Sequence, residues 1–188
     1  MVIEKYNINW KNQFSQIKNV LEKYLSVYTV IEHVGSTAST GMWAKPIIDI
    51  IIVIDSKNDF NKIKDDLENI GYYHNGDQGI TGREVFKRNK KSLNDVLDNI
   101  SHHLYVCEKD NLEYRRNKLF WNYLNIHENS KMEYNKIKHE ILERVGKDNR
   151  RDYVYVKETE YKWFFEEIIK KAEEEEEIKI IEKRHNCT

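Results

Sequence analysis

The chain contains very little cysteine and proline. Its 188 residues include two cysteines, Cys107 and Cys187, and one proline, Pro46. Two cysteines at this spacing fit neither a disulfide framework nor a zinc site, so neither is expected. Cys107 lies in an apolar run, which predicts a buried small hydrophobe, and Cys187 is expected to be a free thiol near the C-terminus.

Long apolar stretches are also missing. The longest, residues 47–54, is interrupted by Asp49, whereas a transmembrane helix needs roughly 20 apolar residues. The first ten residues contain no apolar segment of the kind found in signal peptides. We therefore expect a cytoplasmic protein that does not enter the membrane.

Neither sign of charge dominates. Lysine and arginine total 31 and aspartate and glutamate total 32, for a net charge of -1. This balance gives no evident attraction to nucleic acid or to an anionic membrane, and it leaves the oligomeric state open. The length favours one domain over residues 1–188, with residues from about 173 to 188 forming a solvated helix end and tail.

Hydrophobic periodicity predicts an α+β fold. Apolar residues at helical spacing predict helices at residues 10–25, 60–70, 112–126, 134–145 and from about 156 onward. Alternating or β-branched runs predict strands at residues 30–34, 47–54, 72–74, 84–87 and 102–107. Because a block of helices follows the strands, we predict a mixed β-sheet with helices packed on it and a C-terminal helical block.

Several residues mark the expected ends and surfaces of these helices. Gly71 suits the position after a helix C-terminus. Asp110 with Glu113 and Ser130 with Glu133 have the spacing of capping boxes, in which two side chains bind the free amides of a helix start. Glu–Lys pairs four residues apart indicate a solvated last helix: Glu166–Lys170, Glu167–Lys171 and Glu175–Lys179.

The residues Gly35-Ser36 follow a predicted strand directly. Glycine lets the backbone turn sharply and approach a ligand, and serine can cap a short helix whose free amides attract an anion. Thr37 adds a hydroxyl, and Lys45 adds a positive charge beyond the loop. This combination favours a phosphate-binding turn over a plain turn.

Asp49 lies 13 positions after Ser36, inside a strand that is otherwise apolar. An unpaired buried carboxylate costs several kcal/mol, so Asp49 should face a cation, a metal ion or water. A glycine-serine turn that leads to a strand carboxylate is typical of nucleotidyltransferases, in which the carboxylate binds Mg²⁺. A structural ion pair with a residue such as Lys45 is the alternative.

The segment HVGSTASTGMWAKPIID resembles the signature of the GrpB family, a group of small proteins assigned to the nucleotidyltransferase superfamily. The chain matches the family pattern at His33, Gly35, Ser36, Thr37, Gly41, Lys45, Pro46 and Asp49. The similarity continues at Tyr6 and Trp10, at Gly82-Arg83, at His103-Leu104, and at Tyr153 and Lys157. It therefore extends to about Ala172.

The resemblance implies a Mg²⁺-dependent nucleotidyltransferase that acts on a nucleotide or another phosphorylated small molecule. Asp49 would hold Mg²⁺ and act in catalysis with Lys45. The residues that the resemblance implies for phosphate or nucleotide binding are His33, Gly35, Ser36, Thr37, Arg83, His103 and Lys157. A solvated loop arginine at position 83 and a core histidine at position 103 are the structural alternatives.

The chain also departs from the family pattern. Ser39-Thr40 replaces a valine-proline pair, and Ile51 stands where active nucleotidyltransferases have a second carboxylate. Glu32 and Glu84 are candidates for that missing group by their strand positions. The departure supports a second hypothesis, a non-catalytic module that binds a nucleotide or a coenzyme A-like compound.

Overall fold

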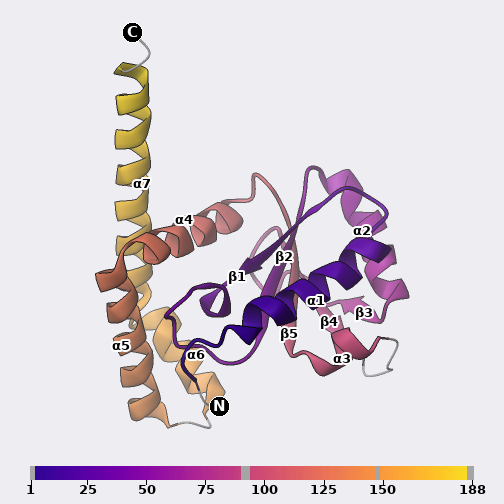
Figure 1. Cartoon of the computed structure of the whole chain (residues 1–188), viewed down its shortest axis with the longest axis horizontal. Helices are drawn as coiled ribbons and strands as arrows, with labels where there is room; N and C mark the ends of the chain where they lie inside the picture. The colour runs from indigo at the N-terminus through magenta and orange to yellow at the C-terminus, as the bar shows by residue number, and fades with distance from the viewer. Residues whose placement is uncertain (1–2, 90–93, 147–148, 186–188) are drawn as a thin grey trace. The chain divides into compact units, whose positions relative to one another are not determined.

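The computed structural model describes residues 3–89, 94–146 and 149–185 (Figure 1). Contacts divide the chain into two compact units. We call residues 3–115 the strand unit and the residues from 116 onward the helical unit. One domain over residues 1–188 remains a prediction, and Cys187 lies outside the described residues.

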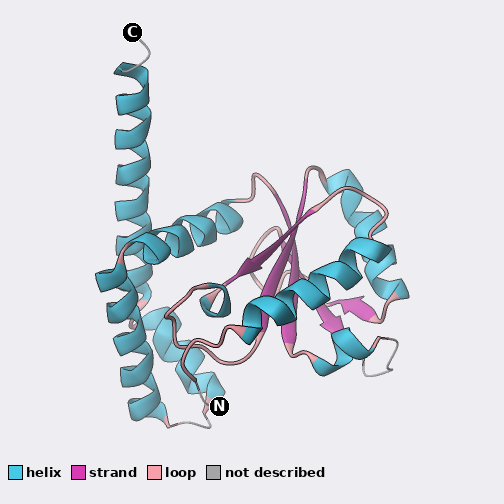
Figure 2. Ribbon diagram, viewed as in Figure 1, coloured by secondary structure: helices cyan, strands magenta, loops and turns pink. Residues whose placement is uncertain are grey.

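The strand unit combines five strands with helices on one face of the sheet (Figure 2). The strands are β1 (Val30–Val34), β2 (Ile48–Ile54), β3 (Tyr72–His74), β4 (Arg83–Arg88) and β5 (His102–Glu108). The helices are α1 (Asn9–Tyr24), the short 3-10 helix η1 (Ser36–Ala38), α2 (Lys57–Asn69) and α3 (Asp95–Asn99). All five strands were predicted within two residues of these bounds.

The sheet has the strand order β1-β2-β5-β4-β3. Strand β2 pairs antiparallel with β1 and parallel with β5, and the other pairs are antiparallel. The sheet is therefore mixed, as predicted for this α+β chain, and β2 lies inside it with a neighbour on each side. The glycine-containing loop at residues 75–82 connects β3 and β4 as a hairpin.

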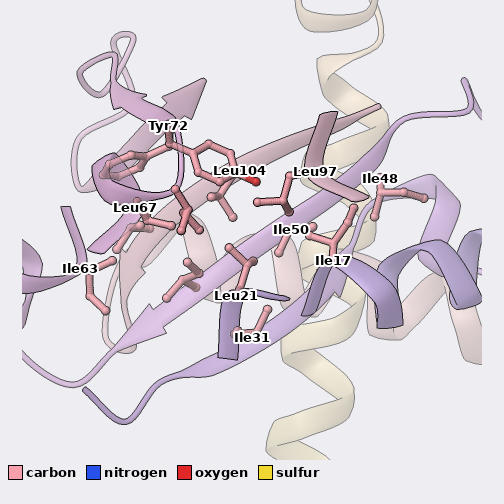
Figure 3. Packing of buried hydrophobic residues seen from close by; sticks show 14 of the residues in the cluster. Ile17, Leu21, Ile31, Ile48, Ile50, Ile63, Leu67, Tyr72, Leu97 and Leu104 are labelled. Carbon is pink, nitrogen blue, oxygen red and sulfur yellow. The ribbon is translucent and has the colours of Figure 1, made fainter. Parts of the chain in front are cut away.

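The main core lies between the sheet and helices α1, α2 and α3. Strand β2 contributes Ile48, Ile50, Ile52 and Ile54, because alternate residues of a strand point to the same face. The helices contribute apolar residues at three- and four-residue spacing, and Figure 3 shows Ile17, Leu21, Ile63 and Leu67 gathered around Ile50 and Leu104. This face of β2 is fully packed.

A smaller apolar cluster lies on the opposite face of the sheet. It joins Ile51 and Val53 of β2 with Cys107 of β5 and Tyr114 of α4 (Leu112–Ile126). Cys107 is buried and free, as predicted, and its burial raises the pKa of the thiol to about 12. Asp49 points to this second face because it lies two positions before Ile51 in β2, and alternate residues of a strand point to the same face.

The helical unit contains most of α4, followed by α5 (Glu128–Val145), α6 (Arg150–Thr159) and α7 (Lys162–His185). Its core combines aliphatic side chains with stacked aromatic rings. Phe120 of α4 stacks on Phe165 of α7 with ring centroids 4.1 Å apart, and Tyr134 of α5 stacks on Phe164 at 5.5 Å. The C-terminal helical block was therefore predicted correctly.

Several helix ends differ from the prediction. The Asn111 side chain, not Asp110, accepts the amide of Tyr114 and caps α4. Helix α5 begins at Glu128, so Ser130 lies inside it and does not cap. The last helix, predicted from about residue 156, is instead two helices: α6 begins after Asn149, whose side chain accepts the amide of Asp152, and ends at Thr159, and α7 begins at Lys162.

The predicted ion pairs on α7 are partly present. Glu167 pairs with Lys171 at 2.5 Å and Glu175 with Lys179 at 3.9 Å. Glu166 instead contacts Arg116 of α4 at 2.7 Å. Among the described residues, none of the helices combines the length and the apolar character that crossing a bilayer requires.

The packing of β2 gives the first testable prediction. Ile52 is completely buried, so Ile52→Ala should lower the free energy of unfolding by about 2–5 kcal/mol through lost burial and a residual cavity. Tyr28, which is 85% exposed, provides the control, and Tyr28→Ala should change stability by less than about 0.5 kcal/mol. Urea unfolding followed by circular dichroism measures both. Equal losses would contradict this description of the core.

Candidate functional site

The turn after β1 has a backbone that favours glycine. Gly35 has φ 79° and ψ -168°, a conformation found essentially only at glycine. Gly35 also occupies the capping position of η1, and no side chain caps that helix. The prediction that Ser36 caps a short helix is therefore wrong, since Ser36 is the first residue of η1 itself.

Gly35 is needed for a second reason, which is space beside Asp49. A Cβ atom added to Gly35 would lie 2.7 Å from Asp49 Oδ2, closer than real Cβ contacts. The pairing of β1 with β2 explains this approach, because Val34 lies opposite Asp49 in the sheet. The phosphate-binding turn predicted from sequence and the strand carboxylate are therefore in direct contact.

His103 binds the other oxygen of the same carboxylate. Strands β2 and β5 pair in parallel with Asp49 opposite His103, and His103 Nδ1 lies 2.8 Å from Asp49 Oδ1. The imidazole N–H donates this hydrogen bond, since a carboxylate can only accept. The two side chains are 32% and 36% exposed, so a ligand can reach them.

Glu32 is a second carboxylate on the Asp49 face. It lies opposite Ile51 in the pairing of β1 with β2, so Glu32 and Asp49 are diagonal neighbours across two strands, about 7–8 Å apart by sheet geometry. The Tyr114 hydroxyl donates a hydrogen bond of 2.9 Å to Glu32 Oε2. The sequence gives no sign that Tyr114 contacts Glu32, because the two residues are 82 positions apart.

Glu84, the other candidate for the missing carboxylate, points to the opposite face. Its carboxylate lies 2.6 Å from His74 Nε2, and His74 packs against Phe60 and Phe86 beneath α2. In β4, Val85 lies opposite Tyr105 on the Asp49 face. Glu84 and Phe86 alternate with Val85 and therefore point to the core face, where Phe86 is buried. Glu84 is therefore separated from Asp49 by the sheet.

His33 and Thr37 form a hydrogen-bonded pair on the α1 side. The Thr37 hydroxyl donates to the carbonyl of Ile47 at 3.3 Å, so the His33 Nε2–H must donate to Thr37 Oγ1, 3.0 Å away. The His33 ring also stacks on Phe14 of α1 at 4.8 Å. Burial lowers the pKa of His33 to about 4, and the nearby Asp49 carboxylate offsets part of this shift.

The three predicted cationic residues are in different places. The Arg83 guanidinium lies 4.9 Å from the centre of the Tyr105 ring, on the Asp49 face, and its Nε is buried without a hydrogen-bond partner in the described residues. Lys45 is half-buried in the connection between η1 and β2. Lys157 belongs to α6 of the helical unit.

The carboxylates fit the ligand preference of Mg²⁺. Among the described residues, no group of three or more His, Cys, Asp or Glu side chains could hold a metal ion. Mg²⁺ is nevertheless commonly bound by one or two carboxylates together with substrate phosphates and water. Asp49 and Glu32 provide such a pair on one face of the sheet, and His103 is less suited to this hard cation.

The contact between Gly35 and Asp49 gives a prediction with a matched control. Gly35→Ala and Gly76→Ala both place alanine at positive φ, which costs about 1–3 kcal/mol. Only Gly35→Ala adds a clash, because a Cβ at Gly76 meets nothing within 4 Å. Thermal unfolding should show a larger loss for Gly35→Ala. The contact is refuted if Gly76→Ala is equally destabilising.

The lowered pKa of His33 predicts a stability change on acidification. Between pH 6.5 and about 4 the unfolded chain binds a proton that folded His33 does not, so this site destabilises the fold as the pH falls. His33→Phe keeps a ring against Phe14 and removes the titration. Urea unfolding at pH 7 and pH 5 should show a smaller acid-dependent loss in the variant, and parallel losses would contradict a neutral His33.

The chain resembles proteins of one family over nearly its whole length. The family model described as "GrpB protein" matches residues 1–171. The chain is 32% identical over 173 residues to the glutamate-rich protein GrpB of Alkalihalophilus pseudofirmus, covering 90% of this chain and 94% of that protein. It is also 32% identical over 139 residues to the UPF0157 protein YqkA of Bacillus subtilis, covering 72% of this chain and 38% of YqkA.

Solved structures extend the comparison to the fold. The crystal structure of the conserved protein GrpB from Enterococcus faecalis has a TM-score of 0.73 and 25% identity, covering 90% of this chain and 98% of that chain. The Cid1 poly(U) polymerase has a TM-score of 0.50 and 15% identity, covering 76% and 45%, and so shares a nucleotidyltransferase fold. By its sequence and its structure, the chain belongs to the GrpB family.

Proposed function

We propose that the protein binds a nucleoside triphosphate with Mg²⁺ and transfers its nucleotidyl group to an acceptor. The observation that carries this proposal is the pair of carboxylates, Asp49 and Glu32, on one face of the sheet beside the Gly35 turn. Partial exposure of Asp49 leaves that face accessible to a ligand.

Each carboxylate has a partner that orients it. His103 donates to Asp49 Oδ1, which leaves Oδ2 directed at the Gly35 turn, and Tyr114 donates to one oxygen of Glu32. Such outer partners set the direction of a metal-binding carboxylate. Asp49 and Glu32 would hold Mg²⁺, which when bound offsets the negative charge that develops during phosphoryl transfer.

The remaining predicted residues near this turn would bind the phosphates or support the turn that binds them. Ser36 offers a hydroxyl at the start of η1, next to Gly35. Arg83 offers a guanidinium on the Asp49 face. The ring of Tyr105, over which this guanidinium lies, helps to hold it in place. Lys45 adds positive charge in the connection between η1 and β2. Thr37 is completely engaged by His33 and Ile47, so both Thr37 and His33 would support the turn.

The fold comparison supports a nucleotide as the ligand class. The Cid1 poly(U) polymerase, which shares the fold, was crystallised with MgGTP bound. A metal–nucleotide complex is the ligand that a carboxylate pair and a phosphate-binding turn would recognise together. We therefore propose a nucleoside triphosphate as the donor of the nucleotidyl group.

One observation favours a second function, binding without transfer. Ile51 is 4% exposed and packs with Val53, Cys107 and Tyr114 in the apolar cluster, where active nucleotidyltransferases have a second strand carboxylate. If Glu32 does not replace that group, the site retains phosphate recognition alone. The chain would then be a module that binds a nucleotide or a coenzyme A-like compound.

Carboxylate variants test the proposed transfer. We expect Asp49→Asn and Glu32→Gln each to reduce Mg²⁺-dependent nucleotide binding and pyrophosphate release by roughly 10–100-fold or more, because the loss of an outer partner alone costs that much. Glu84→Gln is the matched control, since Glu84 lies on the other face of the sheet, and it should leave both unchanged. Calorimetry with and without Mg²⁺ measures binding, and a coupled assay measures pyrophosphate.

The outcomes separate the two functions. Nucleotide binding that needs no Mg²⁺ and survives Glu32→Gln, with no pyrophosphate release, would support the binding module and reject the transferase. A thermal shift screen of nucleotides and coenzyme A compounds completes the test, since bound ligands raise the melting temperature. If no phosphorylated compound stabilises the protein, both functions are wrong.

A further inference from the structure

Strand β4 carries two arginines on opposite faces of the sheet. Arg83 belongs to the Asp49 face, and Arg88 points to the core face because it lies an odd number of positions later. The Arg83 guanidinium lies 4.9 Å from the centre of the Tyr105 ring. The Arg88 guanidinium lies 4.8 Å from the centre of the Tyr72 ring. The two arginines therefore have the same kind of aromatic support and can be compared directly.

Arg88 has the hydrogen bonds expected of an arginine that stabilises the fold. Its Nε donates to Asp98 Oδ1 at 3.0 Å. Its other two nitrogens donate to the same carboxylate and to the carbonyl of Ile70. These oxygen atoms replace the water that a half-buried guanidinium loses.

Arg83 has the aromatic support without the carboxylate. Its side chain is half-buried, and its Nε is buried with no hydrogen-bond partner in the described part of the chain. No carboxylate in that part of the chain pairs with the Arg83 guanidinium. A guanidinium has five N–H donors and is stabilised by oxygen acceptors when it leaves water. The donors of Arg83 are therefore available to an anionic ligand.

The backbone that carries Arg83 is also held in place. The Arg83 amide donates to the carbonyl of Ile80 at 3.0 Å, which closes a turn. The Asn111 side chain donates to the carbonyl of Thr81 at 3.1 Å, and it packs so closely on Gly82 that a Cβ atom there would collide with it. Because both its backbone and its guanidinium are fixed, Arg83 loses little conformational freedom when it binds a ligand.

Arg83 and the Gly35 turn lie on opposite sides of Asp49 along the sheet. Gly35 comes before Asp49 in the direction of β2, since it follows the residue of antiparallel β1 that pairs with Asp49. Arg83 comes after Asp49 in the same direction. It pairs with Cys107, which pairs with Val53 of β2, four positions beyond Asp49. Four residues of a strand span about 13 Å.

Two rings lie between Asp49 and the Arg83 guanidinium. His103 Nδ1 is 2.8 Å from Asp49 Oδ1, and the centroids of the His103 and Tyr105 rings are 6.3 Å apart. The guanidinium lies over the second of these rings. A ligand on this surface would therefore meet the carboxylate, the two rings and the guanidinium in that order.

We propose that Arg83 binds an anionic group, a carboxylate or a phosphate, of the acceptor in nucleotidyl transfer. The phosphates of the donor would lie at the Gly35 turn and Mg²⁺ at Asp49, which leaves the other side of Asp49 for the acceptor. A guanidinium suits both anions because it can donate two parallel hydrogen bonds to them. This inference rests on the proposed function and narrows the role of Arg83 from phosphates in general to the acceptor.

Nuclear magnetic resonance of the isotope-labelled full chain tests this site. Inorganic phosphate and acetate, titrated separately, should shift the Arg83 Nε–H signal until it saturates, because either anion would supply an acceptor for that donor. Arg88 is the matched control, and its Nε–H signal should stay in place because Asp98 already accepts it. Arg83→Lys identifies the signal by removing it. The anion that binds shows whether the acceptor carries a phosphate or a carboxylate.

The affinity for the anion provides a second measurement. Arg83→Gln, followed at the Gly82 backbone amide, should bind the same anion roughly tenfold or more weakly, because a hydrogen bond to a charged group contributes that much. Lys87, an exposed lysine of the same strand, provides the control for net charge. Lys87→Gln should bind as the wild type does, and an equal loss in both variants would contradict a specific site at Arg83.

A non-hydrolysable ATP analogue with Mg²⁺ separates this inference from the proposed function. If the analogue binds and phosphate or acetate still shifts the Arg83 signal, the acceptor role is supported. If the analogue itself shifts that signal and excludes both anions, Arg83 binds the donor and the inference is overturned. It is also overturned if neither anion shifts the signal in the unliganded protein. If the analogue does not bind, the proposed transfer fails and the acceptor role with it, whereas anion binding at Arg83 can still be observed.

Discussion

The candidate site depends on one carboxylate inside the central sheet. Strand β2 reads IDIIIVI, and Asp49 is its single polar residue. The Asp49 side chain is only 32% exposed, and a carboxylate that loses water is destabilised unless a hydrogen-bond donor replaces it, so its neighbours supply both space and a donor. Gly35 supplies the space because it has no Cβ, and His103 supplies the donor. Gly35 and His103 are therefore the two residues that allow β2 to contain Asp49.

The other polar residues are divided between the two faces of the sheet, because successive side chains of a strand point to opposite faces. Glu32 and Arg83 share the Asp49 face, whereas His33 and Glu84 point to the face that α1 and α2 cover. Residues that look equivalent in the sequence thus have different environments. On the covered face, Glu84 contacts His74 at the margin of the core, whereas on the other face Asp49 and Glu32 accept hydrogen bonds from His103 and Tyr114.

The polar cluster on the Asp49 face of the strand unit is acidic. In the strand unit, Glu32 and Asp49 suit a cation that accompanies phosphates. Membership of the GrpB family describes the ancestry of the chain, and this distribution of charge is what directs the functional proposals toward phosphorylated ligands.

The sequence by itself determined the strands, most of the helices and the segment that carries the site. Periodicity identified them because strand and helix faces repeat every 2 and 3.6 residues, and Gly35 and Asp49 were found because their residue types are unusual where they stand. Helix boundaries were less accurate. Asn111 caps α4 in place of the predicted Asp110, one residue earlier, since neighbouring polar side chains compete for the same free amides. Asn149 caps α6, a helix start that periodicity did not predict.

Only the tertiary structure decided which polar residues meet. The choice of Glu32 over Glu84 depends on the register and parity of strand pairing, and Tyr114 reaches Glu32 from 82 positions away. Local patterns report which face of an element a residue occupies, and they carry no information about the element that faces it.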